Sequence, residues 1–168
     1  MRILLPLIAL VLLACAGCTV PGDSAPPATL TWHVSYVIDG DTIIVQLTGG
    51  DRVHVRLIGI DTPEISHSAG EASDCYGQAA ARITRTLASD RDVELQVGRE
   101  RHDRYGRLLA YVSIVGGPAD LERRLLTLGA ARTLTIPPND DRADEYAGLA
   151  REARRAGRGL WGSCGSSS

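Results

Sequence analysis

The chain has 168 residues, a hydrophobic fraction of 44 % and a formal net charge of −2 at pH 7. This length fits one domain of ordinary size, and the hydrophobic fraction is enough for a sizeable core. The near balance of charge argues against a strongly basic protein that coats nucleic acid non-specifically, although it leaves room for a local cationic cleft.

The first 18 residues are typical of a bacterial export signal. Arg2 precedes an apolar run, Ile3–Leu13, which is too short to span a membrane as a mature helix. The small residues of "ACAGC" follow, and "CAGC" is similar to a lipoprotein cleavage motif, although its first position would normally be leucine. We therefore expect lipidation of Cys18. Cleavage by an ordinary signal peptidase after Ala16, or a loose lipoprotein match at Cys15, stays the alternative.

Residues 19–30 contain Pro, Gly and Ser without an apolar period, which predicts a flexible linker. The N-terminal region as a whole predicts a protein exported from a bacterial cell. It is either anchored to a membrane by its lipid, facing outside the cytoplasm, or secreted. We expect a monomer whose only membrane contact is this anchor.

The cysteine count predicts one disulfide bond. If Cys15 is removed with the signal and Cys18 carries lipid, Cys75 and Cys164 remain to pair in an oxidising compartment. A zinc site is the competing interpretation. Two single cysteines far apart, with no C-x-x-C motif and scattered histidines, disfavour it.

The first predicted elements are three strands. From Thr31, apolar and polar residues alternate, and the apolar positions are Trp32, Val34, Tyr36 and Ile38. Two further alternating segments, 43–47 and 53–57, follow the turn sequences "DGDT" and "TGGD". The pattern predicts an antiparallel meander.

Helices and two more strands follow. Apolar residues at four-residue spacing predict a first helix after a polar loop at 65–74, through Ala79, Ile83 and Leu87. Strand periodicity returns at 93–97 and at 108–115, separated by the loop "GRERHDRYG".

The last predicted elements are two helices. One contains Leu121, Leu125 and Leu128 and is ended by Gly129. The other runs from about Asp140 or Asp141 to Gly157. Five strands, split three and two around a helix, fit a small closed barrel better than an open sheet. We predict an α+β, mainly β, fold, namely a five-stranded OB-fold barrel with three helices over residues 31–162, followed by a tail at 163–168.

Three loops carry polar residues that could perform chemistry. Each also has a purely structural interpretation: a hairpin turn for "IDGDT", a helix cap for "IDTPE" and an exposed turn for "DRYGR". Taken together, they supply what phosphodiester hydrolysis needs. Carboxylates can bind a hard cation and serve an attacking water, and arginines can hold the phosphate. The residues in question are Asp39, Asp41, Asp61, Glu64, Arg104, Arg107 and the preceding Arg56.

Four segments, "VIDGDTI", "RLIGIDTPE", "DRYGRLLAYV" and the final "GLW", resemble the thermonuclease, or staphylococcal-nuclease-like, family over about residues 31 to 161. The resemblance implies an OB-fold barrel with three helices. It also implies Ca²⁺-dependent hydrolysis of DNA or RNA at the 5′ side of the phosphate, leaving 3′-phosphate ends. The alternative is a non-catalytic nucleic-acid-binding barrel on the cell surface, which would have no need of Glu64.

The resemblance also implies roles for individual residues. Asp41 and Asp61 would bind Ca²⁺ by carboxylate and Thr62 by its backbone carbonyl, with Asp39 close to the ion. Glu64 would serve the attacking water.

The phosphate contacts implied by the resemblance come from arginines. Arg56 and Arg107 would bind the phosphate that is cleaved, and Arg104 with Tyr105 would contact a terminal phosphate. This sequence departs from the family where the type member has two tyrosines beside the nucleotide. Thr135 and Pro137 stand in the aligned places, which predicts weak stacking of the base.

Overall fold

The computed structural model describes residues 30–66, 68, 70–117 and 120–165. The predicted export signal, all of the linker except Leu30, and residues 166–168 of the tail lie outside these ranges, as does Cys18. Among the helices of the described ranges, none is both long and apolar enough to cross a membrane.

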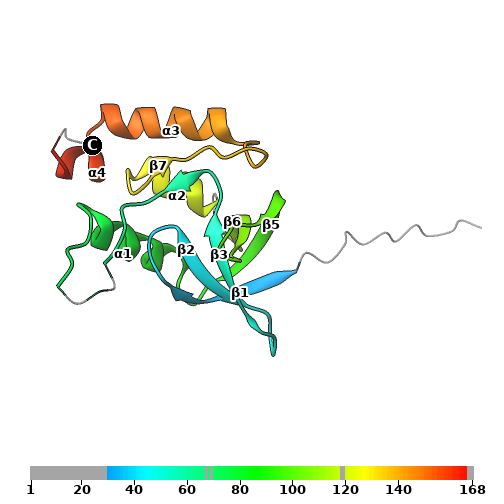
Figure 1. The fold of residues 1–168 in the computed structure, drawn as a ribbon. Coiled ribbons are helices and arrows are strands. Elements are labelled where there is room, and N and C mark those ends of the chain that lie inside the picture. The colour runs from blue at the N-terminus through cyan, green and yellow to red at the C-terminus, as the bar shows by residue number, and fades with distance from the viewer. Residues whose placement is uncertain (1–29, 67, 69, 118–119, 166–168) are drawn as a thin grey trace, which may run out of the picture.

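Five strands form a closed barrel, which confirms the predicted fold class (Figure 1). Around the barrel the strands lie in the order β1-β2-β3-β6-β5, and β6 pairs with β3 in parallel while all other neighbours are antiparallel. Their bounds are Thr31–Val37 (β1), Thr42–Gln46 (β2), Arg52–Leu57 (β3), Asp92–His102 (β5) and Leu108–Ile114 (β6).

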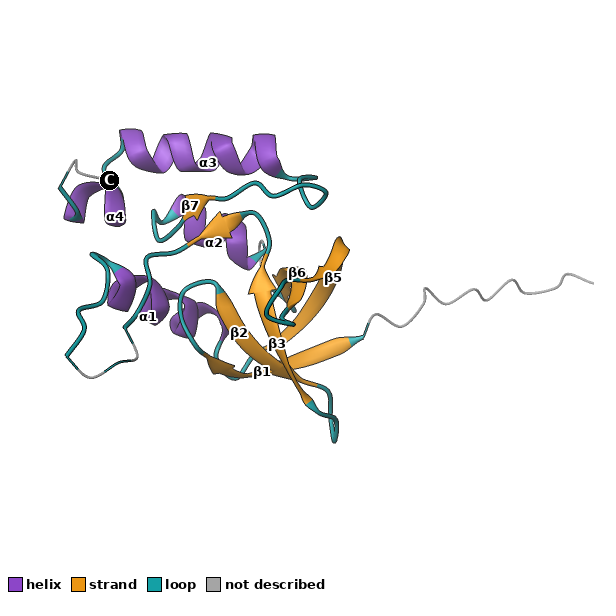
Figure 2. Cartoon of the chain, in the orientation of Figure 1, coloured by secondary structure: helices purple, strands orange, loops and turns teal. Residues whose placement is uncertain are grey.

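The three predicted helices are present and a short fourth follows them. They are α1 (Gly77–Ala88), α2 (Leu121–Thr127), α3 (Ala143–Arg155) and α4 (Leu160–Ser163). Figure 2 shows the helices gathered on one side of the barrel, with a small two-stranded sheet beneath α3. That sheet pairs β4 (Ile60–Asp61) with β7 (Arg132–Thr133), and the sequence did not predict it.

Three details of the prediction were wrong. In β1 the register shifts between Val34 and Tyr36, so Tyr36 is 59 % exposed and Val37 is buried instead, because a bulge reverses the alternation of faces. Residues 98–102 belong to β5 rather than to a loop. In α2, Leu126 is buried, whereas Leu128 lies beyond the helix and is exposed.

Small residues allow α1 to approach the barrel closely. Its most buried positions are Gly77, Ala80, Ala81, Thr84 and Ala88, whereas the predicted apolar positions Ile83 and Leu87 are half-buried against the core. A Cβ atom at Gly77 would lie 2.4 Å from the carbonyl oxygen of Glu64, so only glycine fits at this contact. The first turn of α1 therefore packs directly on the backbone of the "IDTPE" segment.

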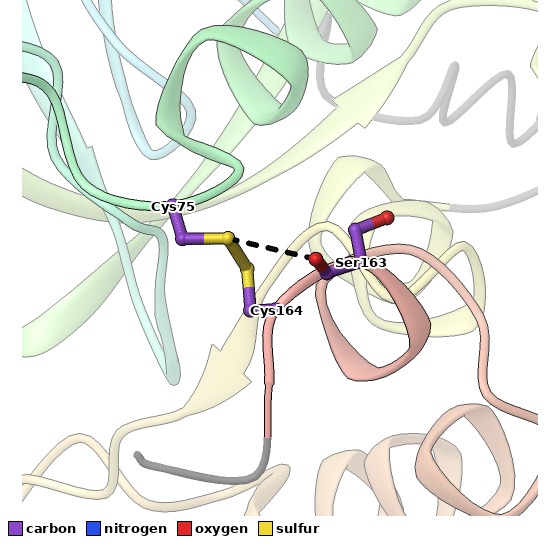
Figure 3. The surroundings of a disulfide bond; sticks show 3 residues. All are labelled: Cys75, Ser163 and Cys164. Carbon is purple, nitrogen blue, oxygen red and sulfur yellow. Dashed lines mark hydrogen bonds between the residues drawn. A yellow bond between two sulfur atoms is a disulfide. The ribbon is translucent and has the colours of Figure 1, made fainter.

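A disulfide bond between Cys75 and Cys164 joins the residue before Tyr76 and α1 to the residue after α4 (Figure 3). The Cys75 sulfur also lies 3.9 Å from the carbonyl oxygen of Ser163. Closing so long a loop restricts the unfolded chain, which in the chain-entropy model contributes roughly 4 kcal/mol of stability.

Candidate active site

The loop between β1 and β2 buries Asp41 against the segment that follows β4. Thr62 donates hydrogen bonds from its backbone nitrogen (2.8 Å) and its hydroxyl (3.2 Å) to Oδ2 of Asp41. A Cβ atom at Gly40 would lie 2.6 Å from the Thr62 hydroxyl oxygen, so this close approach requires glycine. Asp39 is also buried, and its Oδ1 accepts from the backbone nitrogen of Asp41 at 3.1 Å.

Arg56 on β3 links the two acidic loops. Its Nη2 lies 3.2 Å from Oδ2 of Asp41 and 3.3 Å from Oδ1 of Asp61. Its Nη1 donates to the carbonyl oxygens of Leu57 (2.7 Å) and Ile60 (2.8 Å). These bonds fix the guanidinium, so the two carboxylates converge on one point.

Glu64 does not cap a helix. The helix nearest to it, α1, begins at Gly77 after Tyr76, and no side chain caps its N-terminus. Instead, the backbone nitrogen of Glu64 donates to Oδ2 of Asp74 at 3.1 Å, and the backbone nitrogen of Asp74 donates to the Glu64 carbonyl oxygen at 3.0 Å. The cap interpretation of "IDTPE" is therefore wrong, and the Glu64 side chain is left exposed beside the acidic loops.

The acids raise one another's pKa values. Burial raises the pKa of Asp61, and the charge of Asp41 raises it further. Although the Glu64 side chain is exposed, the surrounding protein shields it partly from water, and this, followed by the charges of Asp39, Asp41 and Asp61, raises its pKa. Burial also raises the pKa of Asp41, against the lowering effect of Arg56. The site thus holds more negative charge than Arg56 alone balances, which favours an added cation.

The loop between β5 and β6 brings in the second arginine. Nε of Arg107 lies 2.7 Å from Oδ2 of Asp103, and Nη1 donates to the Thr42 hydroxyl at 3.2 Å. The same hydroxyl donates to Oδ1 of Asp41 at 3.1 Å. Thr42, the last residue of the "DGDT" turn, therefore connects Arg107 to the acidic loops, a role that the sequence analysis missed.

The Tyr105 side chain is exposed, and two arginine guanidinium groups lie over its ring. The guanidinium carbons of Arg104 and Arg107 lie 4.7 and 5.4 Å from the ring centroid. Arg104 also donates to the Tyr105 hydroxyl at 2.6 Å. Arg104 and Tyr105, the two residues expected to contact a terminal phosphate, thus lie on the same exposed turn as Arg107.

A cleft of about 460 Å³ lies beside these arginines. Its charged end contains Arg56, Arg104 and Arg107, and its apolar wall contains Leu109, Leu134 and Ile136. Arg56 lines the cleft and also contacts the acidic loops. It reaches the cleft because β3 pairs with β6 and places Arg56 opposite Leu109, which lines the cleft too.

Thr135 and Pro137 do not line this cleft, which corrects the assignment made from the sequence. The backbone nitrogen of Leu134 donates to the Gly59 carbonyl oxygen at 3.0 Å and fixes the chain just after β7. The alternate residues Leu134 and Ile136 then face the cleft. The wall is aliphatic rather than aromatic.

Within the described ranges, no group of three His, Cys, Asp or Glu side chains is placed to hold a metal ion. The candidate donors are therefore fewer and all are oxygens: the two carboxylates that converge on Arg56, from Asp41 and Asp61, and the backbone of Thr62. Carboxylate and carbonyl oxygens are the ligands that Ca²⁺ prefers, so the chemistry of this donor set fits a hard cation that completes its shell with water.

Comparison with known proteins finds one matching family model and several relatives that are named as nucleases. The family model described as staphylococcal nuclease homologue matches residues 54–163. The chain is 37 % identical over 131 residues to the thermonuclease of Staphylococcus intermedius, covering 78 % of this chain and 76 % of that protein. It is 33 % identical to the thermonuclease of Staphylococcus hyicus, covering 78 % and 75 %. Over 130 residues it is 32 % identical to the endonuclease YncB of Bacillus subtilis, covering 76 % and 60 %.

Proposed function

The chain belongs to the family of staphylococcal nuclease homologues, and from this premise we propose that it is a Ca²⁺-dependent nuclease. It hydrolyses DNA or RNA at the 5′ side of the phosphate and leaves 3′-phosphate ends. The observation that carries the proposal is the convergence of Asp41 and Asp61 on Nη2 of Arg56, at 3.2 and 3.3 Å.

Arg56 and Arg107 hold the phosphate that is cleaved. Arg56 reaches it from the charged end of the cleft, and Arg107 is held in place by Asp103 and Thr42. Guanidinium groups attract phosphate oxygens by charge and by N–H donors, so they bind the substrate and favour the extra negative charge of the transition state. Arg104 and Tyr105 contact a terminal phosphate.

Glu64 serves the attacking water. Its carboxylate lies beside the acidic loops, and in the protein without a cation partial burial and the neighbouring acids raise its pKa. An ionised carboxylate in this place can accept a proton from water. The carboxylate accepts a proton as the water oxygen bonds to phosphorus. The bond between phosphorus and the 5′ oxygen breaks, and that oxygen leaves with a proton from solvent, so the phosphate stays on the 3′ oxygen.

Asp41, Asp61 and the Thr62 carbonyl would hold Ca²⁺, with Asp39 close by. The ion would add positive charge near the phosphate oxygens and the water. Asp41 is already oriented for this by its hydrogen bonds from Thr62 and Thr42.

Digestion of plasmid DNA and of RNA tests this function. The chain without residues 1–18 should degrade nucleic acid with Ca²⁺ and stop when a chelator is added. End-group analysis should find 3′-phosphates. A protein that binds nucleic acid but cleaves neither substrate would instead be the non-catalytic binding module.

For the cellular location, the proposal is a lipid anchor at Cys18, with residues 19–30 as the tether. It is supported by the "CAGC" motif after the apolar run. Mass spectrometry of the native N-terminus tests it. An unmodified chain beginning at Gly17 would show a secreted enzyme instead.

A further inference from the structure

Two arginines lie over the ring of Trp161, outside the site described so far. The guanidinium carbon of Arg132, on β7, lies 5.7 Å from the centroid of the Trp161 ring. That of Arg154, on α3, lies 5.4 Å from it. The three residues come from β7, α3 and α4, which lie together on one side of the barrel (Figure 1). We call them the Arg–Trp–Arg stack.

Neither arginine of this stack forms a close ion pair within the described ranges. In the part of the chain that the structure describes, no carboxylate oxygen lies within 4.0 Å of a nitrogen of Arg132 or Arg154. Glu152, the acid nearest to Arg154 along α3, pairs with Arg158 at 3.2 Å. Arg154 is exposed and Arg132 is half-buried, so both guanidinium groups keep donors for an anionic partner.

The stack begins next to the candidate active site. Arg132 is directly opposite Asp61 in the antiparallel pair of β4 and β7. Directly opposite residues project from the same face of a sheet, so the Arg132 side chain lies beside the carboxylate that contacts Arg56. Two basic side chains thus flank the acidic Asp61, Arg56 by direct contact and Arg132 by attraction from the paired strand, and Arg154 lies next to Arg132 across the Trp161 ring.

We propose that the Arg–Trp–Arg stack binds the phosphates of a nucleic-acid strand that continues beyond the bond being cleaved. This inference rests on the proposed nuclease function and adds a second contact region to it. A guanidinium that stacks on an indole face is held flat while its N–H edge stays free, and that edge matches a phosphate. Such contacts carry no base preference, and they favour long strands over short ones.

The test is binding of a single strand of about 20 nucleotides in chelator, so that no cleavage occurs. The variant is Arg154→Gln, at an exposed position, and the matched control is Arg155→Gln, which removes the same charge from the adjacent exposed position of α3. We expect Arg154→Gln to weaken binding about two- to fivefold. It should also reduce the slope of log K against log salt concentration by about 0.7. Arg155→Gln should change neither.

Equal loss in both variants would overturn the inference, because general attraction by α3 would then explain it. Unchanged binding and slope in Arg154→Gln would also overturn it and leave the stack a purely structural contact. Strand binding by Arg132→Gln tests the other arginine of the stack, which lies next to the candidate active site. Thermal melts verify that this variant folds. Absence of cleavage by the unmodified protein in Ca²⁺ would refute the nuclease function separately, since strand binding is measured without it.

Discussion

Arg56 and Asp41 form an ion pair of 3.2 Å in which the Asp41 side chain is only 3 % exposed and the Arg56 side chain 12 %. Removing one partner of such a pair leaves an uncompensated charge in the protein. We therefore expect Arg56→Gln to lower the free energy of unfolding by about 3 kcal/mol in chelator. It should also abolish most of the nuclease activity.

Calcium should restore part of this lost stability, because a bound cation would replace the charge of Arg56 beside Asp41 and Asp61. Thermal melts with chelator and with Ca²⁺ measure this. The rise in melting temperature caused by Ca²⁺ should be larger for the variant than for the unmodified protein. An equal rise would contradict the assignment of these two carboxylates to the cation.

Glu64→Gln separates the chemistry of Glu64 from its place in the fold. The hydrogen bonds of Glu64 to Asp74 involve its backbone atoms, and the variant keeps both. The rate should fall about 10²- to 10⁴-fold while the melting temperature stays nearly the same. Glu71→Gln, at another exposed glutamate of the same loop, is the control and should leave the rate unchanged. An active but destabilised Glu64→Gln would contradict a role in the reaction.

The titration of Glu64 should reflect the acids around it. Glu64 must be ionised to accept a proton, and partial burial followed by the charges of Asp39, Asp41 and Asp61 raises its pKa in the protein without a cation. In chelator, Glu64 should therefore take up its proton at a higher pH than an ordinary glutamate. Asp39→Asn removes the neighbouring charge that contributes most and should lower this pKa. NMR titration of the Glu64 carboxyl carbon in chelator measures the shift, and an unmoved titration would contradict the coupling of Glu64 to the acidic loops.

The aliphatic wall of the cleft makes a prediction about base binding. Ile136 lines the cleft and is 56 % exposed, whereas Thr135 does not line it. Ile136→Tyr should tighten binding of a nucleoside bisphosphate, because stacking contributes about 1 to 3 kcal/mol per base. Thr135→Tyr is the matched control and should have no effect. Calorimetric titration measures the affinity of both variants. Tighter binding by Thr135→Tyr than by Ile136→Tyr would mean that the assignment of cleft-facing residues in this segment is incorrect.

Stability should depend on pH through Glu122. This carboxyl is completely buried, and both its oxygens lie within 3.3 Å of the Val112 backbone nitrogen. Burial raises its pKa well above the ordinary value. The folded protein therefore keeps a proton that the unfolded chain loses above about pH 4.3, and the contribution of this group to stability decreases as the pH rises.

Glu122→Gln removes this ionisation while keeping the shape of the side chain. The variant should gain stability relative to the unmodified protein at pH 8, and the gain should disappear near pH 4. Urea unfolding at the two pH values measures it. Glu94→Gln, at an exposed position of β5, is the control and should show no such difference. A gain of equal size at both pH values would mean that ionisation is not its cause.

Periodicity in the sequence was enough to predict the barrel strands and the three main helices, because each has one apolar face. It failed at Tyr36, where a bulge resets the alternation without any glycine or proline to signal it. It also failed for the small sheet of β4 and β7. Each of these strands has two residues, which is too short for a period, and their pairing depends on the tertiary fold.

The site was predictable where short motifs carry it. The segments around Asp41 and Asp61 were expected to meet, and both carboxylates lie within 3.3 Å of Arg56. Leu134 and Ile136 were missed because a hydrogen bond to Gly59, distant in sequence, determines which alternate residues face the cleft. Arg132 was missed for a similar reason, since only its pairing with Asp61 places it near the site.

The two hydrogen bonds between the backbone of Glu64 and Asp74 close the intervening segment, 65–73, at its base. Cys75 follows Asp74 immediately and is fixed by its disulfide bond to Cys164. The position of Glu64 thus depends on the anchored ends of the segment 65–73 rather than on the length of that segment. This makes the exposed residues 70–72 of that segment the natural place to insert a foreign peptide, such as an affinity tag or a targeting sequence, while keeping the enzyme active.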